Sequence, residues 1–78
     1  MDNYKVEQAK KLFGAIQGMF WNKERNAEYG HYERLEDCDK VIDNLYKKIE
    51  ELGLTNEEKI YANNNADMDV AEDWYGRY

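Results

Sequence analysis

The chain of 78 residues contains neither proline nor serine, and it has one cysteine, one histidine and one threonine. Because no proline removes a backbone hydrogen bond, most of the chain can be helical. A serine nucleophile is excluded. Cys38 and His31 would be the only cysteine–histidine pair, and on a continuous helix their separation in sequence amounts to about 10 Å. We therefore expect that the protein is not an enzyme.

The sequence also has few residues that could bind a metal or a cofactor. Zinc is held by several Cys and His side chains, and this chain has one of each. One polar stretch alternates like the start of a calcium loop, with Asn63, Asn65, Asp67 and Asp69. Counted from Asn65, however, Val70 stands where that loop needs glycine and Gly76 where it needs a bidentate glutamate. We expect no metal and no cofactor.

Targeting and membrane signals are not found in the sequence either. Residues 1–4 do not begin a basic segment followed by an apolar one, as a signal peptide would. No apolar run approaches the ~20 residues that a membrane span needs. A single cysteine allows no intrachain disulfide and fits a reducing compartment. We expect a cytoplasmic protein.

The formal net charge of −6 is unevenly placed along the chain. Residues 1–25 carry +2, whereas residues 26–53 and residues 54–78 carry −4 each. Phosphates repel such a surface, so we expect no direct contact with nucleic acid or with an anionic membrane. A protein partner with a basic surface is favoured, and the alternative is that the acids serve solubility alone.

Six apolar residues follow a 3-4-3-4-3 spacing: Leu35, Cys38, Ile42, Leu45, Ile49 and Leu52. This spacing predicts a helix over residues 32–52 that packs one face against another helix. Gly53 can take the left-handed conformation that follows a helix end. Thr55 and Glu58 have the spacing of a capping box, which predicts that the next helix begins there.

A first helix over residues 3–23 is predicted by apolar residues at helical spacing: Val6, Ala9, Phe13, Ile16 and Phe20. A turn or kink is expected within residues 22–33, at Asn26 or Gly30. The helix after Thr55 is expected to turn Ile60 and Tyr61 inward. Asp67 should cap a last short helix. The sequence therefore predicts an all-α protein, a small three-helix bundle with a short fourth C-terminal helix, in a single helical domain of residues 1–78.

Two features of the first helix predict contacts. Gly14 and Gly18 lie four residues apart and leave a smooth strip on which another backbone can pack closely. We expect the second or third helix to pack there, and a second copy of the chain is the alternative. Met19, Phe20 and Trp21 cannot all point inward, because successive helical residues are about 100° apart. We expect Trp21 to be partly exposed, either as a cover of the bundle end or as an anchor for a partner.

Two acidic groups are candidates for binding a basic partner. The first shares one face of the second predicted helix and consists of Asp39, Asp43, Tyr46 and Glu50. The second lies in the C-terminal segment and consists of Asp67, Asp69, Glu72, Asp73, Trp74 and Tyr75. Carboxylates on a rigid helix can pair with Arg and Lys, and neighbouring aromatic rings can supply desolvated anchors. Together with Trp21, these residues form the predicted partner-binding site.

In size, acidity and lack of catalytic motifs the chain resembles the small acidic proteins with which phages block host enzymes, including restriction and CRISPR inhibitors. The resemblance implies an anti-defence protein in the host cytoplasm that binds another protein and inhibits it. As a nucleic-acid mimic it would occupy a basic nucleic-acid-binding surface, for example that of a nucleic-acid enzyme. No residue roles follow from this resemblance. The alternative is a homo-oligomeric structural or adaptor module, such as a homodimer, paired through the heptad seam or the glycine strip.

Overall fold

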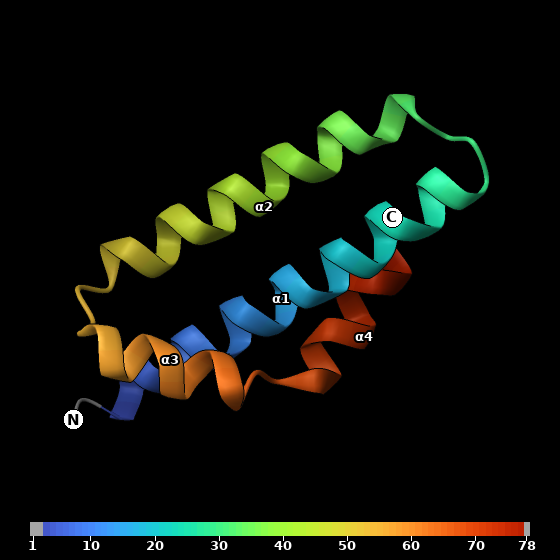
Figure 1. Ribbon diagram of the computed structural model, residues 1–78. Coiled ribbons are helices and arrows are strands. Elements are labelled where there is room, and N and C mark those ends of the chain that lie inside the picture. The colour runs from blue at the N-terminus through green and yellow to red at the C-terminus, as the bar shows by residue number, and fades with distance from the viewer. Residues whose placement is uncertain (1–2, 78) are drawn as a thin grey trace.

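The computed structural model describes residues 3–77, which form four helices and, within that range, no strand (Figure 1). The helices are α1 (Asn3–Glu28), α2 (Glu33–Glu51), α3 (Asn56–Asn64) and α4 (Met68–Arg77). The predicted all-α fold, a three-helix bundle with a short fourth helix, is confirmed.

Helix α1 is the central element of the fold. Figure 1 shows α2 running back along one side of α1, and α3 and α4 following each other along the opposite side. Within residues 3–77, Cα atoms of α2, α3 and α4 come within 8 Å of α1 and not of one another. The elongated fold, with Cα extents of 43 × 21 × 16 Å, therefore depends on two separate faces of one helix.

One face of α1 packs against the predicted heptad seam of α2. Buried side chains from both helices meet there: Ala15, Ile16, Met19, Cys38, Ile42, Leu45 and Ile49. Leu35 and Leu52, the two ends of the seam, are half-buried. The apolar seam of α2 is thus buried against α1 of the same chain.

Helix α1 continues five residues beyond its predicted end at residue 23, and in this respect the prediction is wrong. Asn22 and Asn26, which looked like part of a polar connection, are buried in the helix. The Asn26 amide Nδ2 donates to the Asn22 carbonyl one turn earlier, at 3.0 Å. The turn comes at Gly30, one of the two predicted positions, whose φ of 76° lies in the left-handed region.

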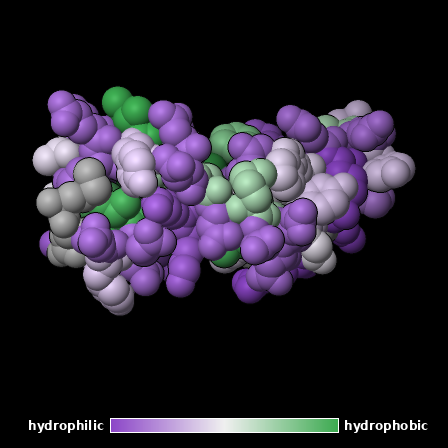
Figure 2. Space-filling model, turned by 90° about the horizontal axis from the view of Figure 1, so that it is seen from below, coloured by the Kyte–Doolittle hydropathy of each residue, from purple (hydrophilic) through white to green (hydrophobic). Residues whose placement is uncertain are grey.

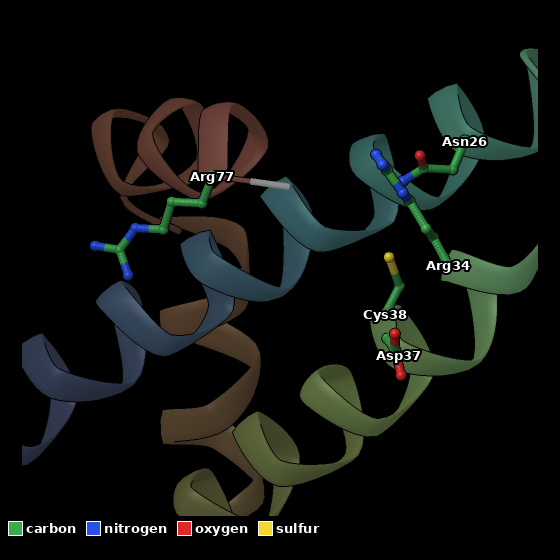
Figure 3. Close-up of a pocket in the computed structure, with 5 residues that line it drawn as sticks. All are labelled: Asn26, Arg34, Asp37, Cys38 and Arg77. Carbon is green, nitrogen blue, oxygen red and sulfur yellow. The ribbon is translucent and has the colours of Figure 1, made fainter. Parts of the chain in front are cut away.

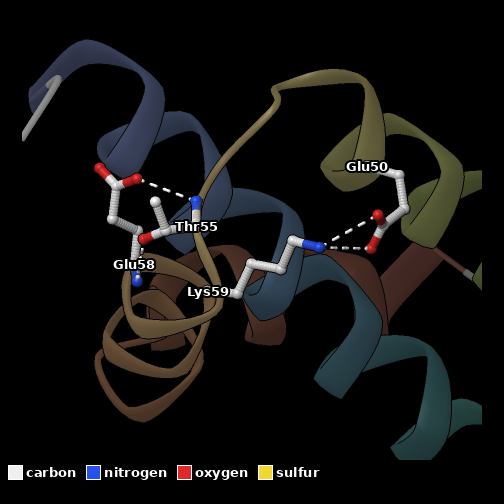
Figure 4. A network of polar contacts seen from close by, with 4 residues as sticks. All are labelled: Glu50, Thr55, Glu58 and Lys59. Atoms are coloured by element: carbon white, nitrogen blue, oxygen red, sulfur yellow. Dashed lines mark hydrogen bonds and ion pairs between the residues drawn. The ribbon is translucent and has the colours of Figure 1, made fainter.

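The connection from α2 to α3 follows the prediction closely. Gly53 has a φ of 69°, and Leu54 after it is buried. The Thr55 hydroxyl accepts from the Glu58 amide at 3.2 Å, and the Glu58 carboxylate accepts from the Thr55 amide at 2.9 Å (Figure 4). Lys59 of α3 also pairs with Glu50 of α2 at 2.9 Å. The capping box is confirmed.

The inward face of α3 was predicted incorrectly. Ile60 and Tyr61 are 62% and 45% exposed, and Ala62 is the buried residue of this helix. Ala62 packs with Val6, Ala9 and Leu54. The small Ala62 side chain packs against α1, and this packing leaves Ile60 on the outer side of the helix.

Helix α4 packs on the glycine strip of α1, where the second or third helix was predicted. A Cβ atom added at Gly14 would collide with the Asp67 carbonyl oxygen, and one added at Gly18 would collide with the Ala71 carbonyl oxygen. The Asp67 amide donates to the Lys10 carbonyl at 3.0 Å. Only glycine lets the two backbones approach this closely, so the strip is covered within the chain.

We expect Gly18→Ala to destabilise the protein by about 1–3 kcal/mol, because the obstructing atom belongs to backbone that cannot rotate away. The matched control is Gly76→Ala in α4, where no atom lies within 4 Å of the added Cβ. That control should be neutral or stabilising by up to about 1 kcal/mol, the helix-propensity gain. Urea denaturation of both variants measures the difference. Equal stabilities would contradict the packing of α4 on this strip.

Candidate protein-binding site

The C-terminal end of α4 is held on α1 by one buried amide. Asn22 has no exposed surface, and its Nδ2 donates to the carbonyls of Trp74 and Tyr75, each at 2.9 Å. These carbonyls belong to the last turn of α4, where side chains from outside a helix commonly donate to its carbonyls. The Asn22 Oδ1 accepts from the Arg25 guanidinium at 2.9 Å. Asn22 therefore fixes the positions of both Tyr75 and Arg25.

Trp21 and Tyr75 meet beside this amide. Their rings are edge to face, with centroids 6.2 Å apart and planes at 81°. The Arg25 guanidinium lies over the Tyr75 ring, 4.6 Å from its centroid. Trp21 is half-buried, whereas Phe20 before it is 40% exposed. The predicted partial exposure of Trp21 is confirmed, although Phe20 is the more exposed of the two.

A surface pocket of about 460 Å³ opens next to this ring pair; we call it the Trp21 groove. It is lined by Trp21, Glu24, Arg25, Glu28, Tyr29 and Tyr75. Glu24 and Glu28 lie one helical turn apart and are exposed, and neither forms an ion pair within residues 3–77. Tyr29 is 70% exposed. The groove thus combines three aromatic rings with two carboxylates and one guanidinium.

A second pocket of about 440 Å³ lies between the ends of α1, α2 and α4 (Figure 3). It is lined by Asn26, Arg34, Asp37, Cys38 and Arg77. Burial and the neighbouring Asp39 and Asp37 raise the pKa of the Cys38 thiol above its usual value. The thiol therefore stays protonated at neutral pH and is a poor nucleophile. Arg77 extends away from the other four residues in Figure 3, so the two arginines do not converge on one ligand.

The predicted acidic face of α2 is partly neutralised within the chain. Asp39 pairs with Lys23 of α1 at 2.6 Å, and Glu50 pairs with Lys59 of α3. Asp43 is exposed and forms no ion pair within the described part of the chain, and Tyr46 beside it is 44% exposed. Two of the three carboxylates predicted on this face are therefore paired with lysines of neighbouring helices.

The second predicted group divides in the same way. The Asp67 carboxylate accepts from the amides of Asp69 and Val70, at 3.0 and 3.2 Å, and so caps α4 as predicted. Asp73 pairs with Arg77 at 2.7 Å. Asp69 and Glu72 are exposed, with no ion pair to any residue from 3 to 77.

The structure joins Trp21 and Tyr75 in one site and adds residues that the sequence did not single out. Trp74 is half-buried, with the Arg77 guanidinium 4.7 Å from its ring centroid. Glu24, Arg25 and Glu28 were missed because the first helix was expected to end at residue 23. Their spacing from Trp21 by three, four and seven places them on one side of a continuous helix.

Among residues 3–77, no three His, Cys, Asp or Glu side chains lie close enough together to hold a metal ion. No helix in this range combines the length and the apolar character needed to cross a membrane.

No protein family, no curated protein and no solved structure matches the chain. The basis for a function is therefore the geometry of the Trp21 groove and the charges around it.

We expect Asn22→Ala to destabilise the protein by about 1–3 kcal/mol, since two partly buried carbonyls of α4 lose their hydrogen bonds to the buried Asn22 amide. Asn44→Ala, at an exposed position of α2, is the matched control and should change stability by less than about 0.5 kcal/mol. Denaturation gives the free energies, and amide hydrogen exchange shows where the protection is lost. Protection should fall first in α4; unchanged exchange there would contradict the role of Asn22.

Proposed function

We propose that this protein binds another protein through the Trp21 groove and inhibits it by covering a basic surface. The observation that carries the proposal is the meeting of three aromatic rings with two carboxylates that form no ion pair within residues 3–77, all in one pocket. Tyr and Trp are enriched among the residues that contribute most to protein interfaces. Carboxylates beside them add orientation and a faster encounter with a basic partner.

The charge of the whole chain supports a basic partner. A net charge of −6 sets up a field that repels nucleic acid and attracts Lys- and Arg-rich surfaces. Asp69 and Glu72 extend this negative charge along α4, the helix that also carries Tyr75. Basic protein surfaces of this kind commonly bind nucleic acid, and a protein that covers one blocks access to it. This supports an inhibitor of a nucleic-acid enzyme, of the type that phages direct against restriction and CRISPR systems.

The surface composition supports selective contact more than nonspecific hydrophobic association. Figure 2 shows a face that is mostly hydrophilic, with hydrophobic side chains scattered among polar ones. The two surfaces that suggested a homo-oligomer, the heptad seam and the glycine strip, are covered by α1 and α4 respectively. Pairing of identical copies through either surface would require this packing to open.

A pull-down from the native or host lysate, repeated with competing DNA or RNA, tests the proposal. We expect capture of a nucleic-acid enzyme that the competitor releases. The double variant Glu24→Lys with Glu28→Lys should lose this capture by charge reversal in the groove. The control, Asp43→Lys with Glu51→Lys, makes the same change of charge at exposed positions of α2 and should retain it.

Two outcomes would contradict the proposal in different ways. Loss of capture in the α2 variant alone would place the contact on α2 and remove the groove from the interface. Capture of the protein's own copies alone, with no other partner, would favour the homo-oligomeric module.

A further inference from the structure

We infer that the Trp21 groove receives an arginine side chain of the partner, stacked on its aromatic rings and paired with Glu24 and Glu28. This inference rests on the proposed function and specifies the chemistry of the partner. It separates an arginine-bearing surface from one whose positive charge comes from lysine.

The chain itself shows which cation the rings at this end of the molecule accept. The Arg25 guanidinium lies 4.6 Å from the centroid of Tyr75, and the Arg77 guanidinium lies 4.7 Å from that of Trp74. A planar guanidinium stacks on an aromatic face, whereas an ammonium acts as a compact, strongly hydrated charge. Trp21 and Tyr29 line the same pocket and offer further aromatic surface for a second guanidinium.

The two carboxylates of the groove supply hydrogen-bond acceptors in a suitable arrangement. Residues four apart on a helix have Cβ atoms about 5–6 Å apart, which places Glu24 and Glu28 on neighbouring turns. A guanidinium has five N–H donors in a fixed planar fork and can bond two such acceptors at once. An ammonium has three donors and lacks this planar match.

Arg25 occupies part of the groove, and it need not leave when a partner binds. Its guanidinium donates to the Asn22 Oδ1 at 2.9 Å and rests on Tyr75, so both its position and its stacking are fixed. Its single positive charge faces two carboxylates in the same pocket, which leaves a net negative charge there. The pocket volume of about 460 Å³ lies within the range of about 300–1,000 Å³ found for ligand sites.

The test is an NMR titration of the full ¹⁵N-labelled chain with three peptides, hexa-arginine, hexa-lysine and hexa-citrulline, at ~150 mM salt. Citrulline keeps the planar shape of arginine without its charge. The observed signal is the indole N–H of Trp21, assigned with Trp21→Phe. We expect hexa-arginine to shift this signal with an affinity about tenfold higher than hexa-lysine, and hexa-citrulline to leave it unchanged.

Two charge-matched variants locate the contact. Glu24→Gln with Glu28→Gln should weaken hexa-arginine about tenfold, while Asp43→Asn with Glu51→Gln should change its affinity by less than about twofold. Equal binding of arginine and lysine peptides, or equal weakening by both variants, would overturn the inference. Binding that shifts only α2 signals would overturn it too. In each of these cases the lysate pull-down still decides, independently, whether the protein has a basic partner.

Discussion

The fold depends on the close approach of the α4 backbone to Gly14 and Gly18 of α1. These two glycines lie one turn apart and have no side chains. The carbonyls of Asp67 and Ala71 can therefore come so close to α1 that a Cβ atom at either glycine would collide with them. This contact gives α1 a second packing face, opposite the one that holds α2. Because α2, α3 and α4 all pack on α1, the described part of the chain forms one elongated body around a single helix.

The same contact creates the candidate site. Once α4 lies on the glycine strip, its last turn reaches Asn22, and the amide of Asn22 holds the carbonyls of Trp74 and Tyr75. Tyr75 then meets Trp21, and the open side of the ring pair faces Glu24 and Glu28. The packing of α4 on the two glycines therefore positions its last turn at Asn22, and Asn22 in turn positions Tyr75 in the Trp21 groove.

Residue spacing was enough to predict most of the fold. The seam of α2 and the capping box at Thr55 follow from local rules of helix packing and helix ends, and both are present. The polar stretch at residues 22–33 misled the prediction of where the first helix ends, because Asn22 and Asn26 lower helix propensity when considered alone. In the structure Asn22 bonds to carbonyls of α4, and Asn26 bonds to the Asn22 carbonyl within α1. The inward side of α3 was missed for a related reason, since a nine-residue helix has too few apolar positions to reveal its orientation.

The candidate site was harder to predict from the sequence than the fold was. Trp21 and Tyr75 were both expected to contact a partner. Only the folded chain shows that these residues, far apart in sequence, lie side by side, with ring centroids 6.2 Å apart. The sequence did not show which acidic residues are available to a partner and which are engaged within the chain. In the structure Asp39, Glu50 and Asp73 form ion pairs, and Asp67 caps a helix. The cap at Asp67 and the Asp73–Arg77 pair are local, but the ion pairs of Asp39 and Glu50 join different helices, and periodicity does not encode which helices meet.

Site-specific photocrosslinking tests the central claim most directly, because it reports contact in the native or host lysate. A photoreactive phenylalanine analogue would replace Tyr29, at the rim of the Trp21 groove, and in a separate variant Tyr46 on α2, both of which are exposed. The account predicts a crosslink to a partner protein from position 29, in a partner peptide that contains arginine, and none from position 46. A crosslink from position 46 alone would contradict it.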